Sequence, residues 1–177
     1  SAENNRMIKI VTGIRRCGKS FLLFNIYKKH LLDRGVSADH IIEINLEDRR
    51  NKNLRDPDAL LAYIDSRMKD SEKYFILLDE IQLVPEFEDV LNSYLHIENA
   101  EVYVTGSNAK FLSKDVITEF RGRGWEIRVR PLSFSEYYAG VGGDKREALK
   151  NFYLYGGLPA VAQFENPEDK QNYLKEI

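Results

Sequence analysis

The chain has 177 residues, and 26 lysines and arginines against 28 aspartates and glutamates give it a formal net charge of −2 at pH 7. This length is enough for one α/β domain with a substantial core and the beginning of a second. The near balance of charge excludes a general attraction to nucleic acid, although it is compatible with a local basic patch.

Cysteine content and hydropathy indicate the cellular compartment in which the protein is expected. The single cysteine, Cys17, excludes an internal disulfide framework and suits a reducing environment, so we expect a cytoplasmic protein. No stretch approaches the roughly 20 apolar residues of a membrane span, and the polar residues 1–6 do not resemble a signal peptide. We therefore expect no membrane partner.

The first elements surround a phosphate-binding motif. The apolar run Met7–Thr12 predicts a strand, and Ser20–Arg34 predicts a helix that ends at Gly35. Between them, residues 13–20 read G-I-R-R-C-G-K-S, an intact G-x-x-x-x-G-K-[ST] pattern. A strand before and a helix after are the context that this motif requires, so the sequence predicts a nucleotide phosphate site.

Each fixed position of the motif has a physical role. Gly13 and Gly18 let backbone N–H groups converge on one anion, and the positive N-terminal end of the following helix reinforces them. Lys19 supplies a mobile positive charge to the β- and γ-phosphates, and the Ser20 hydroxyl is a ligand for Mg²⁺. The other cofactor-binding positions that we predict in this segment are Arg15, Arg16, Cys17 and Phe21.

Some of these positions have alternative interpretations. Arg15 and Arg16 either add charge near the nucleotide or are solvated on the crest of the loop. For Cys17, a variable loop position is favoured over a redox-sensing role.

Strands and helices continue to alternate along the chain. A helix begins at Asp56-Pro57-Asp58, and another follows Pro85 with apolar residues at helical spacing that we interpret as core. The regular alternation predicts a mostly parallel sheet with helices on both faces. The remaining expected strands are His40–Leu46, Tyr74–Leu78, Glu101–Thr105 and Trp125–Val129.

Two carboxylates follow the unbroken apolar strand Tyr74–Leu78. Asp79 at the strand end is placed to hold Mg²⁺ across from Ser20, and Glu80 is placed to act as general base for an attacking water. The alternative is a pair of solvated acids that close a strand. After a phosphate loop, the catalytic interpretation is favoured.

One helix and one strand separate the phosphate-loop unit from the strand that precedes Asp79. This insertion predicts the sheet order 5-1-4-3-2 of a three-layer α/β P-loop NTPase. The turn after the fourth strand would then lie beside the γ-phosphate. Thr105, Ser107 and Asn108 are candidate γ-phosphate sensors, with Asn108 assigned a catalytic role, although a simple turn is the alternative for each.

An arginine pair precedes the fifth strand. The pair is Arg121 and Arg123. Arg123 has a glycine on each side and is a candidate arginine finger acting within its own chain or on a neighbour. A solvated basic loop is the alternative. With Arg128 and Arg130 the pair would form a small basic stripe, which is weak support for nucleic-acid binding.

The character of the chain changes after Pro131. Helices are expected over Ser133–Tyr138, Lys145–Tyr155 and Pro167–Ile177. We therefore divide the chain into a P-loop ATPase core at residues 1–131 and a helical lid, or the start of a C-terminal region, at residues 132–177. The last helix lacks a capping glycine, so we expect the parent protein to continue.

With these motifs in place, the chain resembles the AAA-like P-loop ATPases of bacteria and archaea that carry a C-terminal domain of unknown function. The resemblance implies an ATPase of the ASCE type with Lys19, Ser20, Asp79 and Glu80 in the roles given above. The segments that carry it are Thr12–Ser20, Leu78–Gln82, Tyr103–Asn108, Gly122–Gly124, Pro131–Tyr137 and Gly156–Pro159.

The leading hypothesis is an ATPase that hydrolyses ATP with Mg²⁺ and switches the interaction with an unknown protein partner or with another copy of itself. A GTPase would need a base-reading N-K-x-D, and Asn51–Leu54 ends in leucine instead. A small-molecule kinase rarely needs Glu80 beside Asp79. A nucleotide-dependent DNA- or RNA-associated factor and a non-hydrolysing ATP-binding interaction module remain as alternatives.

Overall fold

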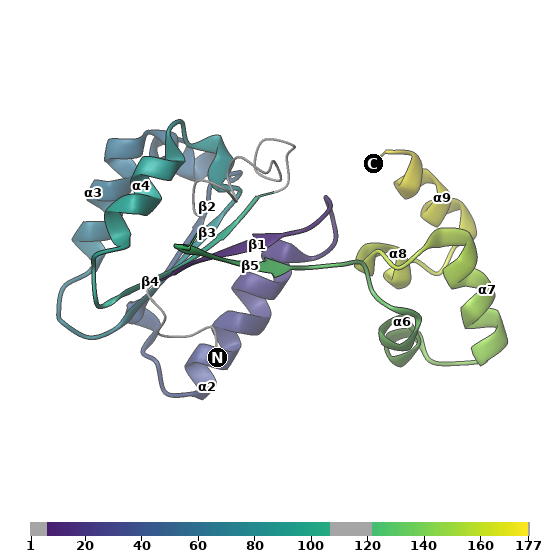
Figure 1. The fold of residues 1–177 in the computed structure, drawn as a ribbon. Helices are drawn as coiled ribbons and strands as arrows, with labels where there is room; N and C mark the ends of the chain where they lie inside the picture. Colours follow the sequence, from purple (N-terminus) through teal and green to yellow (C-terminus); the bar gives the residue numbers. More distant parts are fainter. Residues whose placement is uncertain (1–6, 107–121, 177) are drawn as a thin grey trace. The chain divides into compact units, whose positions relative to one another are not determined.

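A five-stranded parallel sheet organises the larger part of the molecule (Figure 1). The structure is a computed structural model that describes residues 7–106 and 122–176. The strand order is β2-β3-β4-β1-β5, and every neighbouring pair is parallel. The predicted order 5-1-4-3-2 is therefore confirmed. The strands are β1 (Ile8–Thr12), β2 (Ile41–Asn45), β3 (Tyr74–Asp79), β4 (Ala100–Thr105) and β5 (Gly124–Arg128).

The chain packs as two compact units. One unit, here the sheet unit, comprises Ser1–Thr12 and Lys19–Arg128, and the other, here the helical unit, comprises Gly13–Gly18 and Val129–Ile177. The first part of the phosphate loop thus groups with the C-terminal helices, while Lys19 belongs to the sheet unit. The predicted division into residues 1–131 and 132–177 stays a prediction about functional domains.

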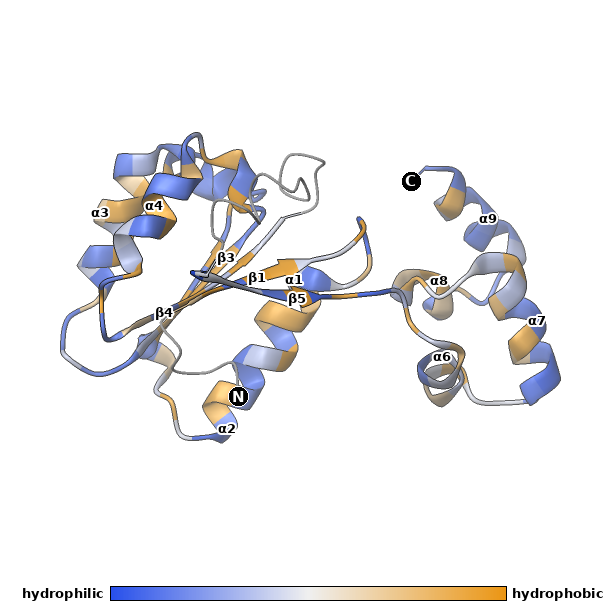
Figure 2. Ribbon diagram, in the orientation of Figure 1, coloured by the Kyte–Doolittle hydropathy of each residue, from blue (hydrophilic) through white to orange (hydrophobic). Residues whose placement is uncertain are grey.

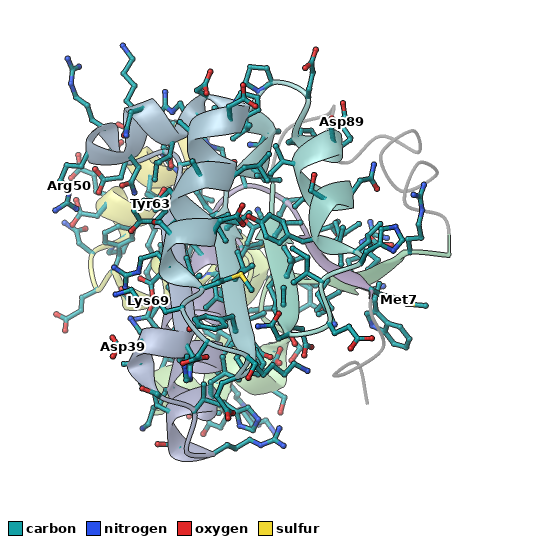
Figure 3. The ribbon with its side chains drawn as sticks, turned by 90° about the vertical axis from the view of Figure 1, so that its left-hand side faces the viewer. Met7, Asp39, Arg50, Tyr63, Lys69 and Asp89 are labelled. Atoms are coloured by element: carbon teal, nitrogen blue, oxygen red, sulfur yellow. The ribbon has the colours of Figure 1, made fainter. Side chains whose placement is uncertain are left out.

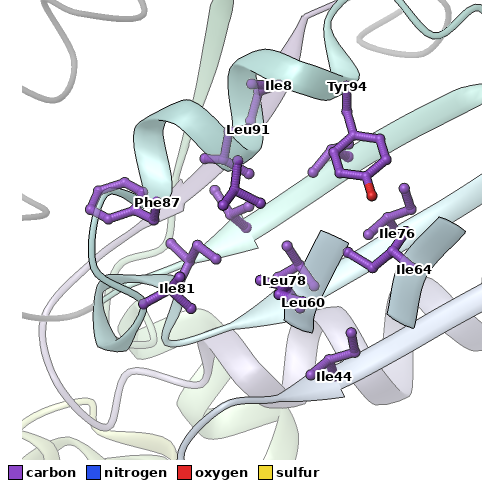
Figure 4. Close-up of a cluster of buried hydrophobic side chains, with 14 of the residues drawn as sticks. Ile8, Ile44, Leu60, Ile64, Ile76, Leu78, Ile81, Phe87, Leu91 and Tyr94 are labelled. Carbon is purple, nitrogen blue, oxygen red and sulfur yellow. The ribbon is translucent and has the colours of Figure 1, made fainter. Parts of the chain in front are cut away.

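One face of the sheet is covered by α3 (Pro57–Arg67) and α4 (Phe87–Tyr94), which enclose the larger apolar cluster (Figure 4). All six residues of β3 are buried, as its unbroken apolar sequence predicts for an interior strand covered on both faces. The apolar positions of α4 after Pro85 lie in this cluster, which confirms their interpretation as core. Residues labelled in the figure from both helices are Leu60, Ile64, Phe87, Leu91 and Tyr94.

The opposite face is covered by the helix that follows the phosphate loop, which completes a three-layer α/β arrangement (Figure 1). This helix consists of α1 (Lys19–Phe21), a π-helical segment η1 (Leu22–Tyr27) and α2 (Lys28–Asp33). Gly35, at φ +87°, ends it as predicted, since its N–H bonds to the Leu32 carbonyl at 2.9 Å. The π-helical segment was not predicted.

The hydropathy of the ribbon follows this layering (Figure 2). Strands β1 and β3 are largely hydrophobic, whereas the helices carry hydrophilic residues on their outer sides. Charged side chains such as Arg50 and Asp89 lie at the rim of the sheet unit (Figure 3). No helix in the described part of the chain is long and apolar enough to cross a membrane.

The helical unit contains four helices among the residues described: α6 (Phe134–Val141), α7 (Lys145–Tyr155), α8 (Pro159–Gln163) and α9 (Pro167–Lys175). The ring of Phe152 packs against Phe134 and Tyr137, with centroids 5.6 and 5.4 Å away. The short helix α8 was not predicted, because five residues give too little apolar periodicity.

Candidate functional site

The glycine at the start of the phosphate loop tolerates no side chain. A Cβ on Gly13 would lie 2.3 Å from the Val129 carbonyl oxygen and 2.8 Å from the Cys17 sulfur. Gly18 has φ +97°, a conformation that L residues rarely adopt. Both motif glycines therefore stand where the backbone requires them, as the sequence predicts.

Cys17 lies beneath the loop. Its side chain is buried, and its thiol donates to the Val129 carbonyl oxygen at 3.7 Å. A redox-sensing cysteine needs an accessible thiolate, so this burial favours a packing role.

The arginines of the loop differ in their surroundings within the helical unit. Arg15 is exposed, whereas the guanidinium of Arg16 lies 4.7 Å from the centre of the Tyr173 ring on α9. Arg16 also has φ +65°, which is unusual for a residue with a side chain. Phe21, in the sheet unit, is 61% exposed. The cofactor-binding roles of Arg15, Arg16 and Phe21 stay predictions.

The sheet unit brings the predicted metal ligands together. Ser20, in the first turn of the helix, donates its hydroxyl to Asp79 Oδ1 at 2.9 Å. Asp79 is the last residue of β3 and is 2% exposed, and the neighbouring Lys19 is 5% exposed. These side chains come from positions 59 residues apart, and strand β3 delivers Asp79 to the edge of the sheet where the helix begins.

The environment of Asp79 suits a cation. Burial raises the pKa of this carboxyl above its ordinary value, although hydrogen bonds from Thr105 and Ser20 and the charge of Lys19 oppose the shift. A buried carboxylate held mainly by neutral hydroxyls gains from a nearby positive charge. The described residues contain no cluster of three or more His, Cys, Asp or Glu side chains that could hold a metal ion by themselves. Ser20 and Asp79 offer oxygen ligands of the kind that Mg²⁺ prefers, and Mg²⁺ keeps waters and phosphate oxygens as its other ligands.

Glu80 has a strained backbone. Its φ of 56° and ψ of 48° lie in the left-handed region, which costs about 1–3 kcal/mol for a residue with a side chain. Such strain is typical of functional sites, where the surrounding structure maintains it. Here the Glu80 N–H donates to Thr105 Oγ1 at 3.1 Å, and the Glu80 carboxylate accepts from Gln82 Nε2.

Thr105 connects the two carboxylate residues. Its hydroxyl donates to Asp79 Oδ1 at 2.5 Å and accepts from the Glu80 N–H, and its side chain is fully buried. Thr105 was predicted as a γ-phosphate sensor. The geometry adds a different role, because Thr105 fixes the Asp79 carboxylate and the Glu80 backbone relative to each other. The role of Gln82 was not predicted, because its only signal was its place in the D-E-I-Q segment.

Of the other predicted residues, Asn108, Ser107 and Arg121 lie outside the described residues, whereas Arg123 is described and does not join this cluster. Arg123 precedes β5 at the end of the sheet where Gly124 pairs with Ile8, and its guanidinium donates to Asn92 Oδ1 at 3.4 Å. The phosphate loop follows the opposite end of β1, ~13–16 Å away along the strand. Arg123 is thus poorly placed to serve its own chain, and a role towards a neighbour stays a prediction.

Two curated relatives align with nearly the whole chain. It is 33% identical over 171 residues to an uncharacterized protein of Haemophilus influenzae, covering 93% of this chain and 42% of the relative. It is 32% identical over 184 residues to the uncharacterized protein MJ1544 of Methanocaldococcus jannaschii, covering 96% of this chain and 39% of the relative. The chain therefore spans about two fifths of the length of these relatives.

Solved structures share the fold at low sequence identity. PCH-2 of C. elegans matches 88% of this chain and 42% of its own, with a TM-score of 0.54 and 17% identity. A DNA polymerase III gamma subunit-related protein of Thermotoga maritima matches 90% of this chain and 57% of its own, with a TM-score of 0.51 and 14% identity. At such identities the similarity establishes the fold alone.

The family is established by the sequence itself. Residues 5–138 match the AAA domain family, which is more than half of the chain and includes the phosphate loop, Asp79, Glu80 and Thr105. The relatives come from a bacterium and an archaeon, in agreement with the resemblance noted from the motifs. The chain belongs to the AAA domain family of P-loop ATPases.

Proposed function

We propose that this domain binds ATP at residues 13–20, hydrolyses it with Mg²⁺ to ADP and phosphate, and uses the cycle to switch an interaction with a protein partner. The observation that carries the proposal is the connected set of Ser20, Asp79, Thr105 and Glu80 in the sheet unit. A plain strand-to-helix turn with solvated acids would need no such connection.

Ser20 and Asp79 would hold the Mg²⁺ ion. Both offer oxygen ligands, and Asp79 is a buried carboxylate that is stabilised by added positive charge. The ion would supply charge neutralisation on the phosphate oxygens. Lys19 would add a second positive charge on the phosphates, and its burial would strengthen that interaction by excluding water.

Glu80 would take a proton from the attacking water. Its backbone is held in the left-handed region, which directs the carboxylate differently from that of Asp79, although the two residues are adjacent. The water oxygen would form a bond to the γ-phosphorus while the bond to the β-γ bridging oxygen breaks, and ADP would leave with that electron pair.

The switching part of the proposal rests on the helical unit and on the relatives. Arg16 in the loop contacts Tyr173 on α9, so a change of loop conformation on nucleotide binding or release would alter this contact with the helix. In the curated relatives more than half of the chain lies outside the matched region, and that part would carry or receive the signal.

The test is ATP turnover by the wild type and by Glu80→Gln. We expect turnover to fall by about 10²–10⁴-fold in the variant, the usual contribution of a general base, while ATP binding persists. Glu86→Gln is the matched control, since Glu86 also has a positive φ of 52° but is exposed and lies outside the cluster. Wild-type protein that binds ATP without turnover would instead support the non-hydrolysing interaction module.

A further inference from the structure

Gln82 follows Glu80 in the short 3₁₀ segment η4 (Ile81–Leu83) and faces the general base that is proposed above. Its Nε2 donates to Glu80 Oε2, so one half of the amide holds the carboxylate. Its Oε1 is buried and has no hydrogen-bond partner among the described residues. The amide is therefore half satisfied.

The orientation of this amide follows from its partner. A carboxylate oxygen only accepts, so the amide nitrogen must face Glu80, and the reversed amide would bring two acceptors together. The unpaired atom is thus the carbonyl oxygen of Gln82. A buried acceptor without a donor costs about 1–3 kcal/mol, so a donor that arrives with the ligand or the solvent would stabilise this amide.

A water molecule that is about to attack phosphorus has two O–H groups to place. One points to the general base, and the other needs an acceptor that fixes the rotation of the water. The carbonyl oxygen of Gln82 belongs to the same amide that holds the Glu80 carboxylate, and it is enclosed in the structure. A rotation of this side chain on nucleotide binding would bring the acceptor beside a water bonded to Glu80.

We propose that Gln82 positions the attacking water, its Nε2 holding the Glu80 carboxylate and its Oε1 accepting the second O–H of that water. The inference rests on the proposed ATPase function. Gln82 takes up no proton in this step, because the proton passes from the water to Glu80 and then to phosphate or solvent. The segment η4 thereby becomes part of the site.

The experiment measures single-turnover and steady-state ATP hydrolysis by Gln82→Met and Gln82→Glu. Methionine has a similar length but no amide, and glutamate keeps an acceptor while it loses the donor to Glu80. We expect both substitutions to lower kcat and the single-turnover rate by about 10- to 100-fold, with KM and the Kd for ATP within about twofold of the wild type. Gln171→Met, on the exposed side of α9, is the control and should retain wild-type turnover.

The result that overturns the inference is a kcat for Gln82→Met within about twofold of the wild type. A loss of kcat matched by an equal loss of ATP affinity, or by a lower urea midpoint, would also overturn it, because a structural role has that signature. Glu80→Gln is measured alongside. If the wild type does not hydrolyse ATP, or Glu80→Gln hydrolyses it normally, the proposed function fails and this inference with it. Turnover that is lost in Glu80→Gln but kept in Gln82→Met rejects the role of Gln82 alone.

Discussion

Strand β4 carries a buried polar cluster towards each end, and the two clusters balance their charges differently. At the amino end, Glu101 accepts from the ammonium groups of Lys9 and Lys73 at 2.9 and 2.5 Å and from the Tyr103 hydroxyl at 2.9 Å. Tyr27 donates in turn to Tyr103. We call this set, centred on Glu101, the amino-end cluster.

The carboxyl-end cluster consists of Asp79, Ser20, Thr105 and Glu80. Here the buried carboxylate of Asp79 accepts from two neutral hydroxyls, at 2.9 and 2.5 Å. The adjacent Glu80 adds a second negative charge, which raises the pKa of Asp79 further. The cluster thus concentrates negative charge at the edge of the sheet.

The pKa shifts reflect this difference. Burial alone would raise the pKa of Glu101, but hydrogen bonds from Lys73, Lys9 and Tyr103 lower it below the ordinary value of a glutamate. Burial raises the pKa of Asp79, and its neighbours do not reverse the shift. The charge of Glu101 is neutralised within the fold, so removing one partner leaves an uncompensated buried charge. Asp79 is held mainly by hydroxyls and is suited to a cation that comes with a ligand.

The largest expected effect is on stability and tests the amino-end cluster. Glu101→Gln leaves Lys9, which is 1% exposed, without its charged partner, and should lower the free energy of unfolding by about 3–5 kcal/mol in urea titrations. Glu43→Gln is the control, because its ion pair with Lys28 is partly exposed and is worth about 0–1 kcal/mol. Equal losses of stability in the two variants would show that the buried Glu101 pair matters no more for the fold than the partly exposed Glu43 pair.

The next effect is on activity and tests the carboxyl-end cluster. Asp79→Asn should lower Mg²⁺-dependent ATP turnover by about 100-fold or more, since it removes a metal ligand and a negative charge. The free energy of unfolding without Mg²⁺ should stay level or rise, because a neutral amide avoids the burial of a charge. A large loss of stability would show that Asp79 is as structural as Glu101.

A smaller contrast compares two hydroxyls on the same strand. Thr105→Val removes the acceptor of the Glu80 N–H, so we expect a loss of about 1–2 kcal/mol in stability and a lower kcat. Tyr103→Phe removes the hydroxyl that donates to Glu101 and should lower stability by a similar amount while kcat is kept. Urea titration and steady-state kinetics on both variants check the contrast.

The smallest expected effect is on the pH dependence of stability, which should have opposite signs for the amino-end and carboxyl-end clusters. Because the pKa of Glu101 is lowered in the folded state, its contribution is complete above the ordinary pKa and is lost as the pH falls through the folded value. The stability difference between wild type and Glu101→Gln should therefore shrink below about pH 4. For Asp79, whose pKa is raised, any gain from Asp79→Asn in Mg²⁺-free buffer should grow as the pH rises from acid. A stability difference between wild type and variant that does not change with pH in the acid range would contradict the pKa shifts assigned to Glu101 and Asp79.

Much of the fold was predictable because its signals are local. The apolar run before Asp79 forms β3, an interior strand that is buried along its whole length, and the strand inserted before it produced the observed order. Asp56 caps α3 by accepting from the Ala59 N–H at 2.9 Å, as its place before Pro57 suggests. The π-helical segment at Leu22–Tyr27 was not predictable, since an inserted residue within a helix leaves no clear mark on apolar periodicity.

The candidate site was predictable in part. Lys19, Ser20, Asp79 and Glu80 could be named from motif spacing, and the sheet unit brings Ser20 and Asp79 into contact. Residue type alone could not separate the roles of arginines. Arg123 became a candidate finger from its flanking glycines, yet strand register places it at the end of the sheet opposite the one that the phosphate loop follows.

The sequence by itself determined the ligand class and the topology, because phosphate recognition depends on a contiguous segment and sheet order on the succession of strands. Only the tertiary structure decided which polar groups meet. Thr105 and Asp79 are 26 residues apart and bond because β3 and β4 pair in a given register. The half-satisfied amide of Gln82 likewise results from a side-chain contact with Glu80 that no sequence pattern indicates. A hydrogen bond requires the right direction and a distance correct to within a few tenths of an ångström. The packing of the elements therefore decides which polar groups meet.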